Sequence, residues 1–134
     1  MRYLAIDYGN KRTGLAICDD SETIVSPLAV IPTGKSLAKR ICDIITSENI
    51  GAVIVGLPLN MDDSVGPQAK IVIAFADRLK KEVDVPLHFQ DERLSSFDAE
   101  QKLAPAEFTR AGKKKRLDAV AAASILEFFL EQKR

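Results

Sequence analysis

Short apolar runs alternate with polar turns over the first part of the chain. The runs Tyr3–Ile6 and Leu15–Cys18 are separated by a short turn that contains two glycines, a pattern typical of a β-hairpin. The next run, Thr23–Ile31, is β-branched and apolar but is interrupted by Pro27, which suits a strand at the edge of a sheet. These patterns predict a three-stranded antiparallel meander.

Helical and strand patterns then alternate. Residues 34–48 carry Leu37, Ile41 and Ile44 at the spacing of an amphipathic helix. Ala52–Val55 is almost wholly apolar, as in strands that are buried on both faces of a parallel sheet, and we expect a loop from Gly56 onward. The remaining elements that these patterns predict are a helix over about 67–82, a strand over 85–90, and helices over about 95–103 and 117–131.

This order of elements predicts an α/β fold. A meander followed by two strands with helical crossovers gives a mixed five-stranded sheet, with three meander strands and two parallel strands, flanked by helices. The chain has 134 residues, of which 46% are hydrophobic and 28% are charged. That length and composition favour one globular domain spanning residues 1–134.

The overall charge of the chain is zero, because 19 basic residues balance 19 acidic ones. Binding to nucleic acid must therefore depend on local basic patches. Cys18 and Cys42 have no metal-binding spacing, so we expect buried, reduced thiols in a cytoplasmic protein. The sequence shows no signal-peptide pattern and no apolar run of transmembrane length. We therefore expect no association with a membrane.

Three acids occupy unusual positions in this predicted fold. Asp7 ends the first apolar strand, and Glu92 follows the strand 85–90. The carboxyl ends of parallel strands lie at one edge of the sheet, so we expect both acids there. Asp118 stands at the head of the apolar helix 117–131. Singly, Asp7 could be a turn-forming residue and Asp118 a helix N-cap, and these alternatives stay open.

Together, the three carboxylates would repel one another unless a cation lay between them. Oxygen ligands favour Mg²⁺ or Mn²⁺, and two such ions can activate water for phosphodiester hydrolysis. The separation of Asp7 and Glu92 is a difficulty for this arrangement. If the strand 52–55 lies between the other two, Asp7 and Glu92 start about 10 Å apart, a distance that the longer side chain of Glu92 and a bridging pair of ions could close.

Basic residues lie beside each of these acids. They are expected to contact a phosphate backbone, together with Asn60 of the Gly56–Gly66 loop, although a charge run is also typical of a solvated loop. His88 and Asp91 are expected to be a packed histidine and a turn acid. The predicted nucleic-acid-binding residues are Lys11, Arg12, Asn60, Arg93, Arg110, Lys113, Lys114, Lys115 and Arg116.

Four motifs in this order resemble the YqgF family. They are LAIDYGNKRTGLA, VGLPLNMDDSVGP, DERLSS and a basic run followed by LDAVAAASIL, and they span nearly the whole chain. Members of the family are described as Holliday junction resolvases and as nucleases for the 5′ end of pre-16S ribosomal RNA. The resemblance implies an RNase H-like fold with catalytic acids at Asp7, Glu92 and Asp118. Two departures, Asp63 in place of a usual glycine and a short segment 104–112, concern loops beside the site.

The resulting expectation is a cytoplasmic, metal-dependent nuclease acting on structured RNA in ribosome biogenesis, with pre-ribosomal particles as possible partners. Cleavage of branched DNA is the alternative, and it would need two active sites, whereas the chain is expected to be a monomer or a weak homodimer. Two further alternatives remain open. One is a non-catalytic RNA-binding module, and the other is an actin-like ATP-binding domain, because Asp7, Gly9 and Gly14 also fit its phosphate-binding turn.

Overall fold

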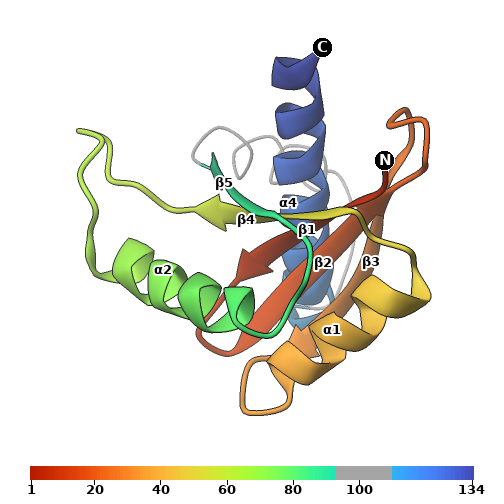
Figure 1. Cartoon of the computed structure of the whole chain (residues 1–134). Coiled ribbons are helices and arrows are strands. Elements are labelled where there is room, and N and C mark those ends of the chain that lie inside the picture. The colour runs from red at the N-terminus through yellow and green to blue at the C-terminus, as the bar shows by residue number, and fades with distance from the viewer. Residues whose placement is uncertain (93–109) are drawn as a thin grey trace.

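The computed structural model describes the backbone of residues 1–92 and 110–134, and the side chains of residues 1–92 and 119–134. Within these ranges the chain forms a sheet flanked by helices on both faces (Figure 1). The elements in chain order are β1 (Tyr3–Tyr8), β2 (Arg12–Cys18), β3 (Val25–Pro32), α1 (Leu37–Ser47), β4 (Ala52–Leu57), α2 (Pro67–Lys80), β5 (Leu87–Asp91) and α4 (Arg110–Lys133).

The sheet confirms the predicted mixed topology. Its strand order is β3-β2-β1-β4-β5, with β1, β2 and β3 antiparallel and with β4 parallel to both β1 and β5. β3 is an edge strand, and its register against β2 shifts between Leu15 and Ala16, so that Ala16 pairs with Pro27. A proline cannot donate a hydrogen bond to a ladder, which explains its place at an irregular edge.

Two apolar layers hold the helices to the sheet. Leu4 and Ile6 of β1 belong to the layer that packs against α1 and α2. Tyr3 and Ala5 belong to the opposite layer, with Ala122 and other residues of α4. Because successive side chains of a strand point to opposite faces, odd positions of β1 face α4 and even positions face α1 and α2.

The last helix is longer than predicted. It begins at Arg110 and ends at Lys133, whereas the apolar pattern placed it at 117–131. Lysine and arginine are good helix formers, and they outweigh the cost of about 1 kcal/mol for one interior glycine, Gly112. Asp118 consequently lies inside α4, so its interpretation as the N-cap is wrong.

Other expectations are corrected or lie outside the described residues. Cys18 is buried, but Cys42 is only half-buried; both thiols are free. The helix expected over 95–103 and the short segment 104–112 lie largely or wholly outside the described residues. In the part of the chain that the structure describes, no helix is long and apolar enough to cross a membrane.

Candidate functional site

Asp7 lies at the carboxyl end of β1, where it pairs with Gly14 of β2. It follows Tyr3 and Ala5 in the alternation along the strand, so its side chain is on the face that α4 covers. It is half-buried there. Its carboxyl group interacts with that of Glu92, whereas a turn-forming aspartate in solvent would have no buried acid beside it.

Glu92 follows β5 and reaches the same place. Its backbone N–H donates a hydrogen bond to the carbonyl of Leu57 at 3.3 Å, which prolongs the alignment of β4 and β5 by one residue. The carboxyl group of Glu92 is hydrogen-bonded to that of Asp7. The structure therefore brings together two of the three predicted acids, although β4 separates the strands that carry them.

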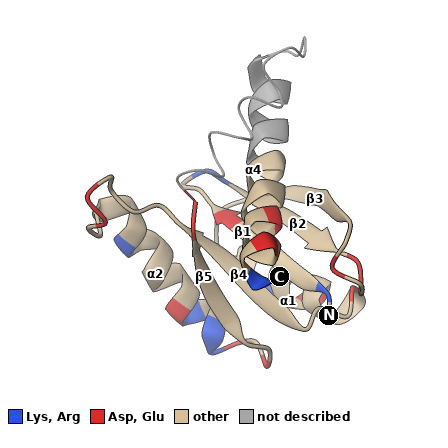
Figure 2. Ribbon diagram, turned by 90° about the horizontal axis from the view of Figure 1, so that it is seen from above, with Lys and Arg blue, Asp and Glu red and all other residues tan. Residues whose placement is uncertain are grey.

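The environment of Glu92 raises its pKa to about 8 from 4.5. Burial is the main cause, followed by the charge of Asp7, the hydrogen bond with Asp7 and the charge of Asp91. Two carboxyl groups in hydrogen-bond contact can hold one proton between them more readily than they can both ionise. The raised pKa of Glu92 therefore favours a carboxyl pair that holds one proton. Figure 2 shows acidic positions in red on the ribbon near the ends of β1 and β5.

The third predicted acid lies on the helix that covers this face. Asp118 is in α4, four residues before the buried Ala122 and seven before the buried Ile125. Its side chain lies outside the described residues. Among the residues that are described, no group of three or more histidine, cysteine or acidic side chains is arranged to hold a metal ion.

The β1–β2 turn is fixed beside Asp7 by a small hydrogen-bond network. A Cβ atom at Gly9 would collide with the carbonyl oxygen of Arg12, so the turn requires glycine there. The hydroxyl of Thr33 donates to the carbonyl of Gly9 at 2.8 Å and lies 2.7 Å from the hydroxyl of Thr13, which is buried. This network holds the turn that carries the predicted phosphate contact Lys11, whose side chain is exposed.

The remaining predicted nucleic-acid contacts are only partly placed. Arg12 is half-buried at the start of β2. Asn60, in the loop after β4, donates its side-chain amide to the hydroxyl of Ser64 at 3.0 Å. Arg93 and the side chains of Arg110, Lys113, Lys114, Lys115 and Arg116 lie outside the described residues.

The loop after β4 explains one departure from the family pattern. Asp63 has a backbone φ of 69°, in the left-handed region that favours glycine. Aspartate tolerates this region better than most side chains do. Its neighbour Asp62 accepts hydrogen bonds from the backbone N–H and the hydroxyl of Ser64, and these bonds lower the pKa of the Asp62 carboxyl. The loop can therefore keep this conformation without the glycine.

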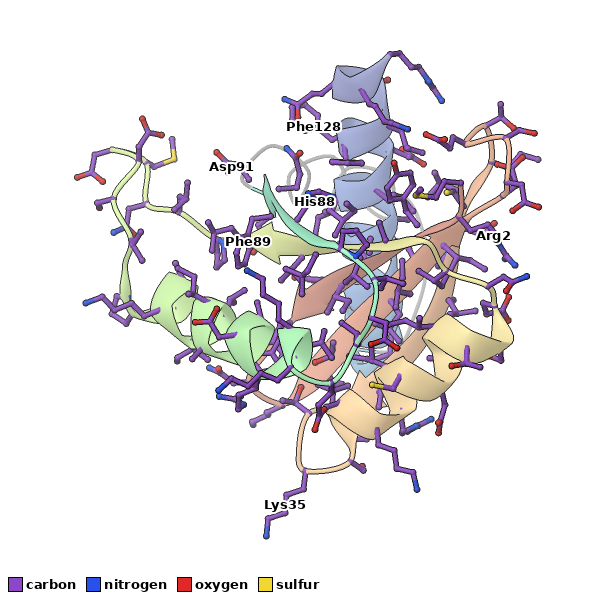
Figure 3. All side chains as sticks on the ribbon, in the orientation of Figure 1. Arg2, Lys35, His88, Phe89, Asp91 and Phe128 are labelled. Atoms are coloured by element: carbon purple, nitrogen blue, oxygen red, sulfur yellow. The ribbon has the colours of Figure 1, made fainter. Side chains whose placement is uncertain are left out.

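Two aromatic side chains near the site, those of Tyr8 and His88, pack against other rings. The ring of Tyr8 stacks on Phe75 with centroids 4.2 Å apart, on the sheet face opposite Asp7. His88 is exposed on β5, and its ring lies over Phe129 of α4 at 6.2 Å, so it is packed as expected but is not buried (Figure 3). Figure 3 also places Asp91 at the end of β5, and Glu92 is the next residue in the chain.

Comparison with known proteins identifies the family of this chain. A family model described as RuvX, Holliday junction resolvase, matches residues 1–132. The chain belongs to the RuvX family. Two relatives carry the name "Putative pre-16S rRNA nuclease". The one from Roseiflexus sp. (strain RS-1) is 38% identical, with 99% of this chain and 96% of the relative covered. The one from Anaeromyxobacter sp. (strain Fw109-5) is 41% identical, with 98% and 97% covered.

Solved structures of resolvases share the fold of this RuvX family member. RuvC from T. thermophilus in complex with a Holliday junction substrate has a TM-score of 0.59 at 15% identity, with 99% of this chain and 96% of RuvC covered. The Fowlpox virus resolvase in complex with its Holliday junction DNA has a TM-score of 0.58 at 17% identity, with 99% of both chains covered. The predicted RNase H-like fold is confirmed.

Proposed function

We propose that this protein is a metal-dependent nuclease that hydrolyses phosphodiester bonds and processes the 5′ end of pre-16S ribosomal RNA. The hydrogen-bonded pair of Asp7 and Glu92 is the observation that carries this proposal. Membership of the RuvX family and the name of the curated relatives support it.

The chemistry of the acid pair fits a hard divalent cation. Its donors are carboxylate oxygens, the ligands that Mg²⁺ and Mn²⁺ prefer. A cation held by the pair would offset the repulsion and the cost of burying charge that raise the pKa of Glu92. Asp7 and Glu92 would hold the metal, with Asp118 of α4 as the third ligand. Divalent ions held there would supply activation of water and stabilisation of the leaving oxygen, most effectively as a pair.

The residues of the chain have separate tasks in this proposal. Glu92 would have to lose its proton to serve as a ligand, so acidic solutions would oppose metal binding. Lys11 and Arg12 stand at the turn beside Asp7, and the basic run Arg110–Arg116 precedes Asp118 on α4. These cations would bind the phosphates on either side of the scissile bond and make the affinity depend on salt.

A second candidate is the resolution of branched DNA. The description of the matching family model as Holliday junction resolvase favours it. Symmetric cleavage of a junction requires two active sites, so this activity would need a dimer.

The test compares two substrates with two variants. Wild type, Asp7→Asn and the control Asp20→Asn, an exposed acid of the β2–β3 turn, are incubated with a 5′-extended 16S RNA precursor and with a four-way DNA junction. Each reaction contains Mg²⁺ or Mn²⁺, with EDTA as the blank. We expect the RNA to be cut by wild type and Asp20→Asn only. Cleavage of the junction alone would transfer the function to DNA, and equal activity of Asp7→Asn would contradict the assigned site.

A further inference from the structure

The contact between Asp7 and Glu92 needs a structural explanation. β4 lies between the strands that carry them, so their backbones are two strand spacings, or about 10 Å, apart. A side chain on β4 at this level, pointing to the same face, would stand between the two carboxyl groups. Their hydrogen bond means that no side chain of β4 stands between them.

Gly56 provides that space. Val55 pairs with Ile6 of β1, so Gly56 is the next residue of β4, at the level of Asp7. Ala52 and Ile54 pack against α4, and Gly56 continues their alternation on the same face. The strand extends to Leu57, so the expectation of a loop from Gly56 onward is wrong.

The crowding around Gly56 is specific. A Cβ atom built on Gly56 would lie 2.5 Å from the Oε2 atom of Glu92 and 2.6 Å from the Cδ1 atom of Ile125. Atoms at such distances must move apart. Gly56 does not have a positive φ, so its backbone conformation is open to any residue. Space alone, and not backbone freedom, requires glycine here.

We infer that Gly56 is a positioning residue of the metal site: by lacking a side chain, it allows Glu92 to lie across β4 and reach Asp7. This inference rests on the proposed function, because the acid pair is taken as the metal ligands. The competing explanation is that Gly56 only makes room for Ile125, so that glycine serves the packing of α4. The two contacts involve different atoms and can be tested separately.

The first variant is Gly56→Ala, with Gly34→Ala as the matched control. Gly34 has nothing within 4 Å of an added Cβ, so the same chemical change is harmless there. Mn²⁺ affinity is measured by titration calorimetry, and thermal unfolding is measured without metal. We expect Gly56→Ala to bind Mn²⁺ about 10–100-fold more weakly, the loss typical of residues that orient metal ligands, and Gly34→Ala to bind as wild type does.

The second variant adds Ile125→Val, which removes the Cδ1 atom that the new Cβ would meet. In Gly56→Ala/Ile125→Val we expect the unfolding temperature to recover toward that of Ile125→Val alone while Mn²⁺ affinity stays low. Restored affinity in this double variant would show that the loss came from packing against Ile125 and would overturn the inference. An unchanged affinity in Gly56→Ala would also overturn it.

The same measurements separate the inference from the proposed nuclease activity. If wild type binds Mn²⁺ and the variants behave as expected, but no RNA or DNA is cut, the positioning role stands and the activity is wrong. If wild type binds no Mn²⁺, both the metal site and the positioning role are wrong.

Discussion

The shared proton of the acid pair should make the stability of the metal-free protein depend on pH through one residue, Glu92. Its pKa is about 8 in the folded protein and 4.5 in an exposed chain. Below pH 4.5 both states hold the proton, and above pH 8 neither does. Between these values only the folded state holds it, so the free energy of unfolding falls as pH rises.

The size of this effect follows from the shift. At 1.36 kcal/mol per pKa unit, a rise from 4.5 to about 8 corresponds to at most about 5 kcal/mol. Relaxation around a half-buried group and entry of water reduce the penalty, so we expect about 2–4 kcal/mol. Glu92→Gln removes the ionisation and keeps a donor for Asp7. It should therefore be more stable than wild type by this amount at pH 8 and equal to it near pH 4.5.

The assay is thermal unfolding by circular dichroism in EDTA at pH 5, 6, 7 and 8. For a chain of this length, 2–4 kcal/mol corresponds to a difference of about 6–16 °C in unfolding temperature at pH 8. Glu131→Gln, the same change at an exposed position of α4, is the control and should follow wild type. Asp19 does not disturb this window. Hydrogen bonds from the backbone of Ile24 and from Thr23 lower its pKa to about 2, so its contribution is lost only in stronger acid.

Parallel curves for wild type and Glu92→Gln from pH 5 to 8 would refute the reasoning, because they would mean that folding leaves the proton affinity of Glu92 unchanged. A wild type that becomes more stable toward pH 8 relative to the variant would refute it more strongly. That result would require a favourable cation-like partner for the ionised pair within the protein itself.

Three further predictions concern other parts of the molecule. Thr33→Val removes the hydroxyl that binds the Gly9 carbonyl and the Thr13 hydroxyl, and chemical denaturation should show a loss of about 1–3 kcal/mol. Ser124→Ala should be neutral or stabilising by up to about 1 kcal/mol in the same assay, because the buried Ser124 hydroxyl has no hydrogen-bond partner among the described residues. Replacing Lys113–Lys115 by alanine should weaken RNA binding and reduce the slope of log affinity against log salt by up to about 2. An unchanged slope would mean that these lysines do not contact phosphates.

The order and pairing of the elements could be predicted because each strand is a short apolar run between clear turn signals. The β1–β2 hairpin follows from two apolar runs joined by a glycine-containing turn, and the parallel strands follow from the helices between them. The ends of elements were less accessible. α4 begins at Arg110, and the prediction missed this start because the first turns of the helix are rich in charged residues. An apolar pattern does not detect such turns.

The acids and their common edge could be proposed from the sequence, but whether Asp7 and Glu92 touch could not be decided from it. Strand order alone places Asp7 and Glu92 about 10 Å apart. Whether they meet depends on what occupies the intervening strand, and that is decided by one missing side chain at Gly56. A signal for it was present, because an isolated glycine in an apolar strand often marks a close approach. The pattern did not indicate which group approaches.

The position of the acid pair also bears on why the chain tolerates it. Three features of this region oppose stability. They are a carboxyl group at a buried strand end, a second carboxyl group that lies across a neighbouring strand, and a glycine in an otherwise apolar strand. In this protein the three features coincide at one edge of the sheet, and each is needed for the contact between Asp7 and Glu92. Unrelated structural compromises would be scattered over the fold, whereas a functional site gathers them, and the cation of the proposed site would offset the repulsion between these carboxyl groups. The departures from ideal folding are therefore the strongest structural argument that this edge is where the chemistry takes place.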